Sequence, residues 1–354
     1  MTGLAIGCMS MAAQGTSAPY SPGITQDAVS YWLPKTKLRV TVTTRRSSFK
    51  PGEFSRYAER YLRLSDVKDK AQEEWEITGI TVSAYGTPDK DNLYTLSFPD
   101  KGNRPYFVLS NDGIIAAVNT HDVEEPLEPV PVATAAQEKE KVNPQDYMTE
   151  EILMAGSTSK MAELTAKEIY SIRESRNSIT RGQADYIPAD GESTVYILEY
   201  LTKQENALLT LFNGTRDVQE HVFTIDVNPD EPISKQILFR FSSKLGVLPV
   251  DNLAGEPVWI DITDKDMLKR QPEETSSKNS KRLGNKAKGP FLYYRIPGRA
   301  EIKIYNNRKS FLEEDVQIAQ FGNVEVISSS VMGKHADTRI TFDTNTGNIK
   351  YINK

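Results

Sequence analysis

Residues 31–42 read Tyr-Trp-Leu-Pro-Lys-Thr-Lys-Leu-Arg-Val-Thr-Val, and the alternation in their second half decides the fold. Leu38, Val40 and Val42 fall on one side of an extended chain and polar residues fall on the other, as a half-buried β-strand requires. A similar stretch, Tyr-Tyr-Arg-Ile-Pro-Gly-Arg-Ala-Glu-Ile-Lys-Ile, occupies residues 293–304. Both stretches begin with aromatic residues, pass through a proline and end in alternating apolar residues. The same structural unit therefore has two candidate starting points.

Further landmarks recur in the same order in the two halves of the chain. Ala84-Tyr-Gly86 is echoed by Ala319-Gln-Phe-Gly322, and the hairpin turn at Gly113 is echoed by a turn at Gly347. Gly86 and Gly113 are 27 residues apart in the first half, and Gly322 and Gly347 are 25 residues apart in the second. The close spacing favours two related β units.

The spacing that follows each proline disagrees by one residue. The first alternating apolar residue lies four positions after Pro34 but five after Pro297. A slip of one residue turns the faces of a strand over, and we expect Gly298 to absorb it in a bulge or a longer turn. Two interpretations stay open: two related β domains, or two unrelated ones with similar turns.

The remaining patterns predict an α+β protein, mainly β, in which two β-rich lobes flank a central helical hairpin. Strands are expected at 29–45, 74–84, 93–98, 105–110 and 113–118, and again from about 218 onward, where they join the second lobe. The expected organisation is a signal peptide at 1–13, an N-terminal β-rich domain at 26–120 with a helical insertion at 51–64, an acidic and proline-containing linker at 121–147, the helical hairpin at 148–215, and a C-terminal β-rich domain at 216–354 with a polar basic loop at 270–289.

Composition excludes some classes of partner and restricts the chemistry. The net charge of −5 gives no footprint for nucleic acid, and no apolar run is long enough to predict a transmembrane helix. The small, apolar first residues favour an export leader, although a basic start is missing. A lipid anchor through Cys8 is the less favoured alternative, because little apolar sequence precedes it. Removal of the leader leaves no cysteine, and therefore no disulfide or thiol chemistry.

No motif assigns a catalytic residue, a metal or a cofactor. The three histidines, His121, His221 and His335, have no second ligand at a metal-binding spacing. No nucleophile elbow, P-loop or dinucleotide-binding turn occurs in the sequence. We therefore expect neither a cofactor nor a metal. A pair of catalytic carboxylates stays open, because sequence does not show which acidic residues lie close together.

Two groups of residues are candidates for binding. Polar side chains near the end of the helix at 157–180 can grip a carboxylate or, as we favour, cap the helix and pair with glutamates of the same chain. These residues are Arg173, Arg176, Asn177, Arg181, Gln183 and Asp185. Aromatic residues near strand starts can form a stacking platform for sugars, although packing is the commoner role. The tryptophans of this candidate platform are Trp32, Trp75 and Trp259.

Several segments of the chain resemble one protein family. The longest is Ala-Gly-Ser-Thr-Ser-Lys-Met-Ala-Glu-Leu-Thr-Ala-Lys-Glu-Ile-Tyr-Ser-Ile-Arg-Glu-Ser-Arg-Asn at 155–177, followed by Thr-Arg-Gly-Gln-Ala-Asp at 180–185. With Lys-Pro-Gly-Glu-Phe at 50–54, these segments resemble the DUF4831 family from Bacteroidetes. The resemblance implies an exported protein of such bacteria. The family is uncharacterised, so no catalytic residue is implied.

The leading hypothesis is a non-enzymatic binding or assembly component of the bacterial cell envelope, periplasmic or envelope-associated. Its partner would be an envelope protein or a glycan, and exposed sheet edges would offer docking sites. The alternative is a carboxylate-dependent hydrolase acting on glycan or cell-wall material, with two carboxylates in a cleft lined by Trp32, Trp75 or Trp259. A third option is an interaction hub at 173–185, which predicts that this connector is exposed.

Overall fold

The structure is a computed structural model, and it describes residues 22–25, 28–97, 105–121, 123, 142–185, 191–266, 291–328 and 338–353. The predicted signal peptide, Cys8, His335, the basic loop at 270–289 and most of the linker at 121–147 lie outside the described residues.

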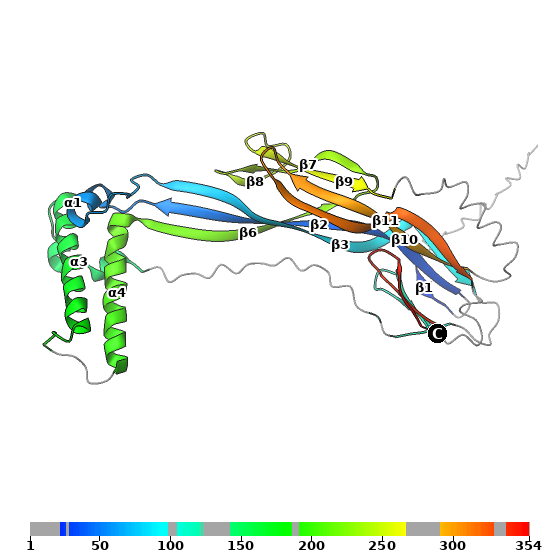
Figure 1. The fold of residues 1–354 in the computed structure, drawn as a ribbon, viewed down its shortest axis with the longest axis horizontal. Helices are drawn as coiled ribbons and strands as arrows, with labels where there is room; N and C mark the ends of the chain where they lie inside the picture. The colour runs from blue at the N-terminus through cyan, green and yellow to red at the C-terminus, as the bar shows by residue number, and fades with distance from the viewer. Residues whose placement is uncertain are drawn as a thin grey trace, which may run out of the picture.

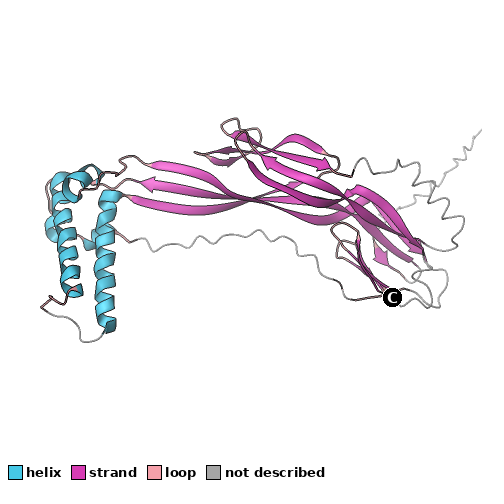
Figure 2. Ribbon diagram, viewed as in Figure 1, coloured by secondary structure: helices cyan, strands magenta, loops and turns pink. Residues whose placement is uncertain are grey.

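Helices gather at one end of an elongated molecule, and strands form the rest (Figures 1 and 2). The longest strands, β2 (Ala28–Lys50) and β3 (Gln72–Ser97), pair in antiparallel fashion along nearly their whole length. Two further strands border β2: β1 (Gly23–Ile24) at its start and β6 (Thr215–Val227) along its second half. We call β1, β2, β3 and β6 the long sheet. The predicted class, mainly-β α+β, is confirmed. The predicted helical hairpin is present, but it lies at one end of the molecule and not between two β-rich lobes (Figure 1).

One strand replaces two that the sequence predicts. The expected strands at 74–84 and 93–98 are both parts of β3. The residues between them do not end the strand, because β2 continues to pair on both sides of a register shift. Turn-forming residues such as Pro88 and Asp89 therefore make a bulge within β3.

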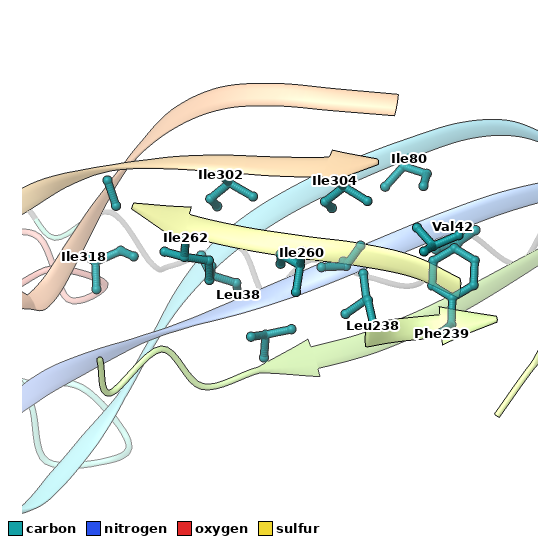
Figure 3. Packing of buried hydrophobic residues seen from close by; sticks show 14 of the residues in the cluster. Leu38, Val42, Ile80, Leu238, Phe239, Ile260, Ile262, Ile302, Ile304 and Ile318 are labelled. Carbon is teal, nitrogen blue, oxygen red and sulfur yellow. The ribbon is translucent and has the colours of Figure 1, made fainter. Parts of the chain in front are cut away.

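A second sheet, which we call the covering sheet, packs on the middle of the long sheet. Its strand order is β11-β10-β9-β7-β8. Leu38 of the long sheet meets Ile260 and Ile302 of the covering sheet in one continuous apolar core (Figure 3). The strands are β7 (Ile233–Ser242), β8 (Gly246–Leu248), β9 (Glu256–Asp264), β10 (Phe291–Tyr305) and β11 (Ser310–Ser328).

A third sheet, the end sheet, lies at the end of the molecule away from the helices (Figure 1). Its order is β13-β12-β5-β4, and it shares a second apolar core with the first residues of β2. Tyr31 and Leu33 of β2 are fully buried in that core. The strands are β4 (Phe107–Leu109), β5 (Ile115–Val118), β12 (Arg339–Phe342) and β13 (Ile349–Asn353).

Two of the three sheets, the long sheet and the end sheet, combine strands of the two expected lobes. β6, expected to join the C-terminal lobe, instead pairs with β2 over thirteen residues, from Leu38 opposite Val227 to Lys50 opposite Thr215. β12 pairs with β5 in the end sheet. Both pairings join segments far apart in sequence, which hydrophobic periodicity alone does not reveal. The domain boundaries as such stay a prediction.

The same irregularity occurs in the two hairpins that start with the similar stretches. Between Trp32 and Pro34, a step of two residues in β2 opposes a step of five in β3. Between Ile296 and Gly298, a step of two residues in β10 opposes a step of five in β11. Leu33 therefore corresponds to Pro297, and the one-residue mismatch seen from the prolines disappears. The buried residues Leu38 and Ile302 each lie five positions further on.

The short hairpins that follow are similar, but the positions they contact differ by one residue. In the alignment of the two bulges Trp32 corresponds to Ile296, whereas the second hairpin contacts Arg295. Gly113 and Gly347 both have positive φ, and their carbonyls accept hydrogen bonds from the backbone N–H groups of Trp32 and Arg295 respectively. The landmark at Gly86 and Gly322 is wrong. Gly86 pairs with Thr36 beyond the bulge, whereas Gly322 lies within the bulge of β11. The shared bulge supports two related β units, and the relation itself stays a prediction.

The helices form a separate body, which we call the helical head, at the tip of the β2–β3 hairpin (Figure 1). Its first part is the segment for which the sequence predicts a helical insertion at 51–64. This segment contains a 3₁₀ turn, η1 (Ser55–Tyr57), and a short helix, α1 (Ala58–Leu62). The other elements are η2 (Pro144–Tyr147), α2 (Glu150–Leu153), α3 (Thr158–Thr180) and α4 (Gly191–Asn213).

Candidate functional site

The helical head has an apolar core of its own. α3 begins at Ser157, whose hydroxyl accepts a hydrogen bond from the backbone N–H of Lys160. Ala162, Ala166 and Ile169 then recur at helical spacing and face the core. Small alanines let α3 approach the chain segments that enter and leave the long sheet. The head is therefore built by its own residues and not by the β cores.

The head is fixed to the tip of the long sheet by close backbone contact. The N–H of Phe54 donates to the carbonyl of Leu211 at 2.7 Å, and the Phe54 ring meets Phe212 edge-on, with centroids 5.5 Å apart. A Cβ atom on Gly52 would lie only 2.2 Å from the Leu211 carbonyl oxygen. Gly52 is thus required where the hairpin tip meets α4.

Two of the six predicted polar residues converge on one carboxylate. Glu205 of α4 is 7% exposed, and its two oxygens contact Arg173 Nε at 2.6 Å and Arg176 Nη1 at 2.7 Å. The arginines are themselves about one-third exposed. Their carboxylate partner is therefore supplied by the chain itself, which agrees with the favoured interpretation of intramolecular pairing.

The other four predicted polar residues do not join this cluster. The Asn177 backbone carbonyl accepts hydrogen bonds from the Arg181 N–H and the Thr180 hydroxyl as α3 ends. The side chains of Asn177, Arg181, Gln183 and Asp185 are exposed. The described part of the connector lies at the surface, as the hub hypothesis requires.

Sequence reasoning missed Glu205, although a signal was present. Leu201, Glu205, Leu208 and Phe212 are spaced so that they share one face of α4. A glutamate within an apolar stripe needs a partner, because an unpaired buried charge is costly. The two arginines of the 155–177 motif are that partner.

Apolar side chains on the outer surface of the head are exposed to solvent. On α4, Tyr196 is 69% exposed, Val195 55% and Tyr200 47%. The Tyr200 ring lies 6.3 Å from that of Tyr147, centroid to centroid. Met154, which follows α2, is 79% exposed. Exposed apolar groups gathered on one element are typical of interaction surfaces.

The three tryptophans of the predicted platform lie apart. Trp32 pairs with Leu93 at the end-sheet end of β2, whereas Trp75 pairs with Arg46, fourteen residues further along that strand. At about 3.3 Å per residue, this separation is roughly 46 Å. Trp259 lies in the covering sheet. The three side chains therefore do not form one platform.

A buried ion pair joins the β2–β3 hairpin to the β10–β11 hairpin. Arg295 Nη2 donates to Asp89 Oδ2 within the bulge of β3, and Lys35 Nζ lies 3.6 Å from the other carboxylate oxygen. Burial lowers the pKa of the Arg295 guanidinium, and the neighbouring Asp89 carboxylate opposes that shift. The Nε atom of Arg295 is buried and has no partner among the described residues. The pairing of Asp89 with Arg295 was not visible in the sequence, since the two residues lie 206 positions apart.

Within the described residues, no three His, Cys, Asp or Glu side chains are arranged to hold a metal ion. His221 instead stacks on Trp75, with ring centroids 4.9 Å apart. None of the described helices combines the length and the apolar character needed to cross a membrane.

Comparison with known proteins gives one match. A family model described as Domain of unknown function (DUF4831) matches residues 27–350, which is nearly the whole chain. No curated protein and no solved structure matches the chain.

Proposed function

The chain belongs to the DUF4831 family, and from that premise we propose that it is a non-enzymatic binding or assembly component of the bacterial cell envelope. In this proposal the helical head contacts a partner protein, and the long sheet holds it away from the two β cores. The exported location rests on the leader-like first residues.

The observation that carries the proposal is the exposed apolar surface of α4. Tyr196 and Tyr200 lie one helical turn apart and, with Val195, face away from the head core. Tyrosine is enriched at the centre of protein interfaces, because it combines a large apolar ring with a hydrogen-bonding hydroxyl. The head also stands at the tip of the molecule, where a partner has access (Figure 1).

The test is affinity capture from a solubilised native envelope fraction, using the full chain as bait. A variant with Tyr196→Ser and Tyr200→Ser should lose a protein that the wild type retains. The control variant, Tyr351→Ser, removes an equally exposed tyrosine from β13 at the opposite end and should retain it. Equal thermal unfolding midpoints would show that the head variant is folded.

Two further measurements complete the test. Arg181→Ala removes an exposed connector charge without touching the Glu205 cluster, so its effect separates the hub hypothesis from a surface centred on α4. Fractionation of cells that express the native chain should place it in the periplasm or the envelope. Recovery in the cytoplasm, or identical captured proteins for wild type and head variant, would contradict the proposal.

A further inference from the structure

The outer face of the covering sheet carries an aromatic pair beside a charged pair. Val258, Ile260 and Ile262 of β9 are buried between the sheets, so Trp259 and Asp261 face the other way. In β10 the buried residues are Ile302 and Ile304, so Lys303 and Tyr305 face outward. The register places Trp259 opposite Tyr305 and Asp261 opposite Lys303.

The two rings lie side by side. Their centroids are 5.8 Å apart and their planes are inclined by 36°. Both residues are half-buried, so part of each side chain packs on the sheet and part is exposed on this face. A protein interface more often uses an anchor that inserts into a pocket of the partner. Flat rings instead suit a ligand that is itself flat and bears C–H groups.

The surroundings of the Trp259 ring differ from those of the other two tryptophans. Trp75 has His221 against its ring and Gly246 so close that an added Cβ would lie 2.9 Å from the indole. Trp32 lies against Gly113 in the short hairpin. Among the described residues, the ring contact of Trp259 is with Tyr305, which lies beside it in the sheet.

The charged pair supplies directed hydrogen-bonding groups near the rings. Asp261 and Lys303 lie two residues along their strands from the aromatic pair, so the backbones of the two pairs are roughly 7 Å apart. Asp261 accepts a hydrogen bond from the Lys235 backbone N–H, and Lys303 Nζ lies 3.0 Å from Glu313. Burial raises the pKa of the Tyr305 phenol, and the interaction with the Asp261 carboxylate adds to this shift.

We propose that this face binds a chain of hexopyranose sugars, with one ring stacked on Trp259 and Tyr305 and the next unit held by Asp261 and Lys303. The C–H groups of a pyranose ring carry partial positive charge and are attracted to the negative face of an aromatic ring. The carboxylate accepts from hydroxyl or amide N–H groups of the sugar, and the ammonium donates to hydroxyl or acetamido oxygens. The inference deepens the proposed envelope function and rests on it for the choice of a glycan.

The test is isothermal titration of the full chain with two soluble probes, the β-1,4-linked hexamers of N-acetylglucosamine and of glucose. Binding of either hexamer is expected, and preference for the first would assign a role to the acetamido group. Trp259→Ala and Tyr305→Ala should each weaken binding at least tenfold, whereas Trp259→Phe, which keeps a ring, should weaken it less. Trp75→Phe is the matched control and should bind like the wild type.

The outcomes separate this inference from the proposed function. The variant with Tyr196→Ser and Tyr200→Ser should bind the hexamers normally, since the head lies far from the covering sheet. Failure of both hexamers to bind the wild type would overturn the sugar site, whatever the capture experiment shows. Unchanged binding by a folded Trp259→Ala variant would overturn it as well.

Discussion

At the scale of single residues, Tyr31 connects the two β units. Its hydroxyl donates to the carbonyl of Tyr293 at 3.0 Å and accepts from the Tyr293 N–H at 2.8 Å. Tyr31→Phe leaves both backbone groups without this partner in a buried place, and we expect a loss of about 1–3 kcal/mol in the free energy of unfolding. Urea denaturation measures it. An unchanged midpoint would show that water replaces the hydroxyl.

The same phenol predicts a pH effect. Burial raises the pKa of Tyr31 above its ordinary value. The unfolded chain releases this proton near pH 10, while the folded chain keeps it, so stability falls as pH rises above about 10. We expect the fall to be shallower in Tyr31→Phe than in the wild type. Denaturation midpoints at pH 8, 10 and 11 test this, and parallel curves would contradict it.

Asp89 has a different role, because it compensates a buried charge. Asp89→Asn leaves the Arg295 guanidinium without its carboxylate, and we expect a loss of about 3–5 kcal/mol in the free energy of unfolding. Asp91→Asn is the matched control. Its carboxylate also lies near Lys35, at 3.9 Å, but is largely exposed, so little change is expected. Similar losses in both variants would show that the effect is not one of burial.

At the scale of residues, the sequence predicts which side chains are buried but not which side chains they contact. The alternation at 38–42 predicts which residues of β2 are buried, because that depends only on the period of an extended chain. The environment of Trp75 depends on His221 and Gly246, which arrive from other strands. A tryptophan that packs and one that faces outward therefore look alike in the sequence.

At the scale of elements, the helical head should unfold separately from the sheets. Phe212 is fully buried in the head core, and Phe212→Ala should cost that core about 3–5 kcal/mol. Hydrogen exchange should then accelerate in α3 and α4 but not in β9 or β10. Ile302→Ala should produce the opposite pattern. Faster exchange in both regions of one variant would show that head and sheets form one cooperative unit.

Elements were predicted well where the pattern is local. α3 and α4 follow from apolar residues at helical spacing and, for α3, from the cap at Ser157. At the bulge in β3 the sequence predicts the end of a strand, because proline and aspartate favour turns and the partner strand is not known from the sequence. The placement of β6 beside β2 depends on a pairing across about 180 residues, which no local pattern encodes.

At the scale of the whole molecule, shape is the property to test. A compact chain of 354 residues would have a radius of gyration of about 20 Å. The 23 residues of β2 alone span roughly 76 Å at about 3.3 Å per residue, and the head extends beyond them. Small-angle X-ray scattering should therefore give a radius of gyration clearly above about 20 Å. A value at that figure would contradict the elongated arrangement.

The two β units depend on each other. Tyr31 of the first unit reaches the backbone of β10, and Arg295, which occupies the corresponding position in the second, reaches Asp89 in β3. The end sheet takes two strands from each unit. Neither unit completes its own core, so we expect them to fold together as one base from which the head projects.

The long sheet also has a mechanical consequence. β2, β3 and β6 run from the base to the head as three continuous backbones. A strand rises about 3.3 Å per residue, which is close to the greatest reach of a fully extended chain. Tension applied between head and base is therefore carried in β2 and β6 by covalent bonds that have almost no slack, whereas the bulge of β3 contains residues that can still extend. The sheet transmits a pull with very little stretching, so a displacement at one end reaches the other almost in full.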